Sequence, residues 1–207
     1  MKIKQMAARL TVVLAALPLL LIFGWLLILR QQPLPPLDYP GFDACMLPCW
    51  AGILPDETRT LDAPQVMASQ FAGAEFEFSQ VGMQINFTID SPEQRLEGVI
   101  YDDRGVVGSL RVMLRMPLWQ LMETLGTPQC ISTQTYPDGG ELVSLWWVND
   151  QHAISSGVIL PPPPEWDASA QVFTLAVFND TERCHAPDVK PWQGFAPLWF
   201  YRLNRAG

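Results

Sequence analysis

The chain has 207 residues, of which 49% are hydrophobic and 16% are charged, a composition typical of a folded protein rather than of a disordered acidic tail. The first 37 residues hold four of the 13 Lys and Arg residues and none of the 21 Asp and Glu residues, so the remainder carries nine basic and 21 acidic residues. Such an acidic surface repels phosphate backbones, which argues against a nucleic-acid partner.

Residues 10–29 form an uncharged run of 20 residues, LTVVLAALPLLLIFGWLLIL, which as a helix spans roughly 30 Å of hydrocarbon. Three basic residues precede this run and only Arg30 follows it before the first acidic residue, so the positive-inside rule predicts that residues 1–9 are cytoplasmic. A cleaved secretory signal is the alternative, but no A-x-A spacing follows the run. We expect a single-pass protein of the cell membrane, anchored in the lipid bilayer by residues 10–29, with its C-terminal domain outside.

Residues 30–44 contain four prolines and are predicted to form an extended spacer, followed by an ectodomain over residues 45–207. Cys45, Cys49, Cys130 and Cys184 all fall in this ectodomain. An even number of cysteines in an oxidising compartment predicts two disulfides, for which we favour the pairs Cys45 to Cys49 and Cys130 to Cys184 among three connectivities. A zinc site is the alternative, although the chain has no C-x-x-C pair.

The first half of the ectodomain is predicted to contain one helix and several strands. The helix begins after Asp62 and ends at Gly73. The stretches EFEFSQ and QINFTID alternate apolar and polar residues, as strands do. A hairpin is expected at Asp102-Asp103-Arg104-Gly105, where the two carboxylates are interpreted as turn formers, with a cation site as the alternative.

The second half repeats this order. The segment MPLWQLMETL predicts a helix that Gly126 ends, and strands are expected over residues 130–136, 142–148, 152–160 and 172–178. The order predicts an α+β ectodomain in which helices pack on an antiparallel sheet, with two tandem helix-then-strands units over residues 45–114 and 115–207 as a further expectation.

The phrase Pro48-Cys49-Trp50-Ala51-Gly52-Ile53 resembles the Pro-Cys-Trp-x-Gly-Ile motif with which the outside domain of a group of bacterial membrane-anchored proteins opens. More remotely, the helix ending in Leu125-Gly126-Thr127-Pro128 and followed by strands is similar to the outer-membrane-assembly lipoproteins and β-lactamase-inhibitor proteins. Those proteins are binding modules, so the resemblance implies binding rather than catalysis. They commonly have a Pro-Gly-x-Thr turn before the first helix, where this chain has Pro55-Asp56-Glu57-Thr58, so Asp56 is expected to adopt the backbone angle of a glycine.

We predict no catalytic residue, metal site or cofactor. The chain has only two histidines, His152 and His185, and it lacks the G-x-S-x-G, H-E-x-x-H and phosphate-loop motifs. Eight tryptophans are an unusually large number for this length, and aromatic side chains are enriched at interfaces. The candidate interaction residues in the second half are Trp147, Trp166, Trp192 and Trp199.

The sequence therefore predicts a membrane-anchored extracytoplasmic domain that binds a protein or another component of the envelope. One alternative is an extracytoplasmic enzyme, either a hydrolase or a thiol-disulfide oxidoreductase that uses Cys45 and Cys49, because a bridge over so few residues can be reducible. The other alternative is an accessory subunit of a membrane complex, held by its membrane span.

Overall fold

The computed structural model describes Pro18, Leu37 and residues 39–45, 47–90, 95–149 and 151–202. Residues 36–207 form one compact unit, distinct by its contacts from residues 1–35. The predicted cytoplasmic segment 1–9 and, apart from Pro18, the predicted transmembrane helix 10–29 lie outside the described residues. Within the described ranges no helix has both the length and the apolar character needed to cross a bilayer.

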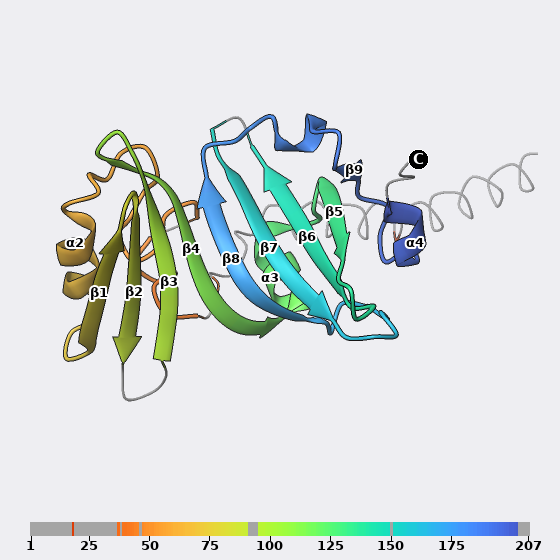
Figure 1. The fold of residues 1–207 in the computed structure, drawn as a ribbon, viewed down its shortest axis with the longest axis horizontal. Coiled ribbons are helices and arrows are strands. Elements are labelled where there is room, and N and C mark those ends of the chain that lie inside the picture. The colour runs from red at the N-terminus through yellow and green to blue at the C-terminus, as the bar shows by residue number, and fades with distance from the viewer. Residues whose placement is uncertain are drawn as a thin grey trace, which may run out of the picture. The chain divides into compact units, whose positions relative to one another are not determined.

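The compact unit is built on a single antiparallel sheet of nine strands in the order β1-β2-β3-β4-β8-β7-β6-β5-β9 (Figure 1). The first meander consists of β1 (Glu75–Val81), β2 (Gln84–Asp90), β3 (Arg95–Asp103) and β4 (Val106–Pro117). The second consists of β5 (Cys130–Thr135), β6 (Glu141–Val148), β7 (Ala153–Leu160) and β8 (Gln171–Phe178), and β9 (Lys190–Pro191) pairs with β5 at its edge. The two meanders join where β4 pairs with β8.

The helices described in this unit are few and short. They are α2 (Ala63–Gln70), α3 (Leu118–Leu125), α4 (Leu198–Tyr201) and a 3₁₀ turn at Arg183–His185. The prediction of helices packed as a layer on the sheet is therefore wrong. The physical reason is that an eight-residue helix makes about two turns, and α2 buries only Ala63 and Met67 while α3 buries only Leu118 and Leu121, which is too little to cover nine strands.

The division into two tandem units also needs correction, because the sheet is continuous. The expected boundary between residues 114 and 115 falls inside β4, whose residues from Ser109 to Pro117 pair with β8. One cluster of buried side chains extends through both halves of the sheet. The two meanders consequently share one core instead of having one each.

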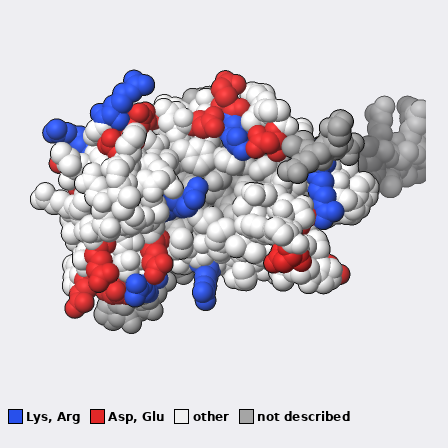
Figure 2. Space-filling model, in the orientation of Figure 1, with Lys and Arg blue, Asp and Glu red and all other residues white. Residues whose placement is uncertain are grey.

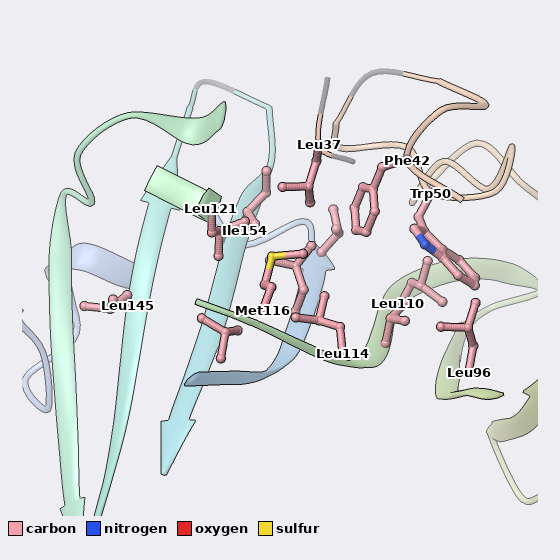
Figure 3. Close-up of a cluster of buried hydrophobic side chains, with 14 of the residues drawn as sticks. Leu37, Phe42, Trp50, Leu96, Leu110, Leu114, Met116, Leu121, Leu145 and Ile154 are labelled. Atoms are coloured by element: carbon pink, nitrogen blue, oxygen red, sulfur yellow. The ribbon is translucent and has the colours of Figure 1, made fainter. Parts of the chain in front are cut away.

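Loop residues cover much of the face that the short helices leave. Leu37, Phe42 and Trp50 pack over Leu110, Leu114 and Met116 (Figure 3). The Trp50 ring stacks on Phe87 with centroids 5.5 Å apart, and its indole nitrogen donates a hydrogen bond to the Pro40 carbonyl at 3.0 Å. The segment before α2 is thus part of the core.

Two local predictions about turns agree with the backbone. Arg104 and Gly105 connect β3 to β4 with φ angles of 56° and 90°, and two positive φ angles are the mark of a tight hairpin turn. Asp56 has a φ of 66°, in the left-handed region that favours glycine. The Asp102 carboxylate accepts hydrogen bonds from the Gly105 amide at 3.1 Å and from the Thr60 hydroxyl. It therefore stabilises the turn, as the sequence predicted.

Candidate binding surface

The strand register gives the sheet two chemically different faces. On the covered face, Ile85, Ile100, Leu110, Val177, Ile154 and Trp147 form one cross-strand row, and all of them are buried. The adjacent row on the opposite face contains Ser79, Asn86, Val99, Arg111, Ala176, Ser155, Trp146 and Cys130. We call this second face the open face. Figure 1 views the sheet from this side, and α3 lies behind the strands, on the covered side.

Small side chains form the middle of the open face. Ala176, Ser155 and Ser144 lie on the adjacent strands β8, β7 and β6. Gly157 stands beside them, where a Cβ atom would lie 2.7 Å from Thr174 Cγ2 and 2.9 Å from a Phe173 ring carbon. The Phe173 ring and the Thr174 side chain therefore cover Gly157, and Figure 2 shows a hollow over the middle of the sheet.

Aromatic rings border these small residues toward one end of the strands. Trp146 and Phe178 meet edge to face with centroids 5.2 Å apart. The Arg183 guanidinium lies over the Trp146 ring, 4.8 Å from its centroid, and its Nη2 atom also pairs with Asp188. Each of these side chains is therefore in contact with another one of the border.

Two cations of the open face have no carboxylate partner among the described residues. Arg111 and Arg115 are exposed on β4, and neither forms an ion pair with any described residue, unlike Arg95, Arg183 and Arg202. Arg115 lines a pocket of about 500 Å³ together with Tyr39, Arg95, Glu97, Met113 and Phe173. Burial raises the pKa of the Tyr39 hydroxyl in this pocket, and the neighbouring Arg115 opposes that rise. The pocket is therefore both cationic and aromatic.

The structure separates the four tryptophans that the sequence singled out as interaction residues. Trp147 is only 5% exposed, and its indole nitrogen donates to the Gly126 carbonyl at 2.9 Å. Trp166 and Trp192 pack edge to face with centroids 5.4 Å apart, and Tyr201 joins them. Trp199, in contrast, is 69% exposed. Trp147 thus lies in the core and not on the open face, where its neighbour Trp146 lies.

Sequence reasoning did not identify Arg111 and Arg115. The signal was present, since the apolar residues Leu110, Val112 and Leu114 alternate with Arg111 and Arg115 along β4. Residues that are two or four positions apart in a strand point to the same face of the sheet, so Arg111 and Arg115 share a face. What the sequence could not show was that no described helix or loop covers this face.

The cysteines form the two disulfides that we favoured, Cys45–Cys49 and Cys130–Cys184. The second bridge ties β5 to the 3₁₀ turn, which also carries Arg183 at the border of the open face. No free cysteine remains in the described part of the chain.

The titratable side chains elsewhere are scattered. His185 is exposed and its Nδ1 atom lies 3.0 Å from Glu182 Oε2, while His152 lies just before β7. No group of three or more His, Cys, Asp or Glu side chains converges as a metal site within the residues described. In comparisons with known proteins, no family model, curated protein or solved structure matches the chain.

Proposed function

We propose that this protein is a membrane-anchored binding domain whose open face takes an extended, acidic segment of a protein partner outside the cytoplasm. The observation that carries the proposal is the pair of exposed arginines, Arg111 and Arg115, which project from β4 without a counter-ion among the described residues. The compartment and the anchor rest on the uncharged run of residues 10–29.

Charge complementarity supports an acidic partner at this place. The chain carries a net charge of −8, so most of its surface repels carboxylates at long range. Arg111 and Arg115 place two positive charges on this face, and arginine binds carboxylates through two parallel hydrogen bonds. An acidic segment is thus guided to the open face in preference to the rest of the surface.

The shape of the open face supports an extended segment. Ala176, Ser155 and Ser144 place short side chains on three adjacent strands, and the rings of Trp146 and Phe178 stand at the border. Rigid aromatic side chains beside a shallow floor are typical anchors in interfaces, because they bury area at a small cost in conformational entropy.

A photo-crosslinking experiment on the full chain in its native membrane tests this proposal. A photoreactive amino acid replaces Ser155 on the open face or, as the control, Glu123, which is exposed on α3. We expect a crosslinked product of discrete mass from position 155 and not from position 123. The double variant Arg111→Glu/Arg115→Glu should abolish that product, whereas Arg111→Lys/Arg115→Lys should retain most of it.

Other results would contradict the proposal. A product that forms equally from both positions, or that survives the charge reversal, would show that the arginines do not select the partner. The absence of any product from position 155 would show that the open face is not occupied.

A further inference from the structure

The first strand of the sheet has one edge that pairs with no described strand. Among the described strands β1 pairs with β2 alone, and six of its seven residues are exposed. At the other end of the sheet the edge strand β9 has only two residues, one of them Pro191. A short edge strand and a proline both hinder pairing with the strand of another chain. β1 has seven residues and contains no proline, lysine or arginine, so it lacks most of the usual protection.

The turn that follows β1 determines which backbone groups face outward. Gly82 and Met83 form a two-residue turn between the paired residues Val81 and Gln84, with φ of 62° at Gly82. In such hairpins the residues that flank the turn form a hydrogen-bonded pair, and the pairs then alternate along the strands. The N–H and C=O groups of Phe76, Phe78 and Gln80 therefore point away from β2, and no described residue bonds to them.

The side chains of the edge also expose apolar area. Phe78 is 38% exposed, and its ring stacks on Phe76 with a centroid distance of 5.9 Å. The Phe76 ring in turn packs against the Phe71 ring, with centroids 6.5 Å apart. The Phe71 ring packs against the buried Trp50. A line of aromatic rings thus runs from the core to the unpaired edge, where it ends in solvent.

We propose that β1 binds β1 of a second copy of this chain in antiparallel orientation, centred on Phe78, so that the two sheets become continuous. In this register Phe78 faces Phe78 of the second copy, and Phe76 faces Gln80 of the second copy. Phe76, Phe78 and Gln80 are the residues whose backbone groups point outward. In this register each of their N–H and C=O groups bonds to the opposite strand. A twofold axis through Phe78 makes the edge complementary to itself.

The pattern of charge favours the same register. Glu77 faces Ser79 of the second copy and Glu75 faces Val81, so no two carboxylates stand directly opposite each other. A slip of two residues toward the N-terminus would place Glu77 opposite Glu77, and like charges in that position destabilise a sheet. The register centred on Phe78 is also the one in which all seven residues of β1 overlap.

Cysteine crosslinking of the full chain in membranes tests the register. Directly opposed residues of a hydrogen-bonded pair have Cα atoms about 5.5 Å apart, within the range of a disulfide. Phe78→Cys alone should therefore give a disulfide-linked dimer under mild oxidation. Phe76→Cys alone should give none, because its copies lie about 13 Å apart along the strands, but it should crosslink to a differently tagged chain that carries Gln80→Cys.

A second pair of variants tests the interface without a new thiol. Gln80→Pro removes an outward N–H, a position where an edge strand tolerates proline, so the monomer should keep its melting temperature while the dimer is lost. Gln80→Ala keeps the N–H and should keep the dimer. The molecular mass of the full chain in detergent, from light scattering corrected for the detergent, distinguishes the two states.

The proposal would be overturned by a monomeric wild-type chain at every concentration, by a dimer that survives Gln80→Pro, or by crosslinking of Phe76→Cys to itself as efficient as that of Phe78→Cys. If the strand of another protein occupied the edge, Phe78→Cys would give no homodimer, which would also overturn it. The inference does not depend on the open face, since β1 can pair while Arg111 and Arg115 remain accessible.

Discussion

Glu141 and Arg202 are 61 residues apart in the sequence and form an ion pair at the start of β6. The Glu141 side chain is fully buried, whereas Arg202 is 46% exposed. Glu141 Oε1 accepts hydrogen bonds from Arg202 Nε at 2.9 Å and from the Thr135 hydroxyl at 3.0 Å. The pair fastens the segment after β9 to the second meander.

Removal of Arg202 should leave a buried carboxylate without its cation. We expect Arg202→Ala to lower the free energy of unfolding by about 3 kcal/mol, measured by urea denaturation. Glu141→Gln in the same chain should restore most of the loss, because an amide costs less to bury than a charge. As a control, Arg95→Ala removes a half-exposed pair with Glu97 and should cost no more than about 1 kcal/mol. Equal losses for the two arginines would contradict this account.

The two disulfides should differ in their contribution to stability. The Cys130–Cys184 bridge spans 54 residues and the Cys45–Cys49 bridge spans four. Loop-closure entropy predicts about 4 kcal/mol for the longer bridge and about 2 kcal/mol for the shorter one. Replacement of each pair by alanine, followed by thermal unfolding, measures the difference. If the short bridge contributed more, the entropic explanation would not apply to this protein.

Trp147 and Trp199 form a matched pair of substitutions, since one is 5% and the other 69% exposed. Trp147→Ala should lower the free energy of unfolding by about 3 to 5 kcal/mol, because it opens a cavity beneath α3 and leaves the Gly126 carbonyl without its donor. Trp199→Ala should change it by less than about 0.5 kcal/mol. Urea unfolding of both variants provides the comparison, and similar values for the two would refute the burial assigned to Trp147.

Tyr201 should make stability depend on alkaline pH. Its hydroxyl accepts a hydrogen bond from the Gln193 amide at 2.8 Å and donates one to the Gly194 carbonyl at 2.7 Å, and burial raises its pKa above the ordinary value of 10.0. The unfolded chain therefore loses this proton at a lower pH than the folded chain does. Stability is fully present below pH 10 and falls as pH rises through the window between the two pKa values.

Absorbance titration of the phenolate at 295 nm, combined with urea unfolding at pH 7 and pH 10.5, measures this effect. Tyr201→Phe should reduce the alkaline loss and should itself cost about 1 kcal/mol at pH 7 through the lost hydrogen bonds. If the variant loses as much stability as the wild type above pH 10, Tyr201 is not responsible, and Tyr39, whose pKa is also raised, becomes the group to test.

Strand positions were largely predictable, because alternation is a local property. In QINFTID the residues Ile85, Phe87 and Ile89 are buried as the pattern indicates. The same alternation places Trp146 and Trp147 on opposite faces. It does not say which of the two faces is covered, since that depends on loop residues such as Trp50 that are distant in sequence.

The strands and the turn at Gly105 could be predicted from the sequence because each depends on neighbouring residues, and the cysteine pairing could be favoured because only three connectivities were possible. The pairing of β4 with β8 in one continuous sheet, the exposure of Arg111 and Arg115 on a face that no described element covers, and an edge of β1 that no described strand pairs with were visible only in the fold. The physical reason is that strand order and the covering of a face arise from contacts between distant segments. Hydrophobic periodicity shows that a strand has a buried side but does not identify what buries it.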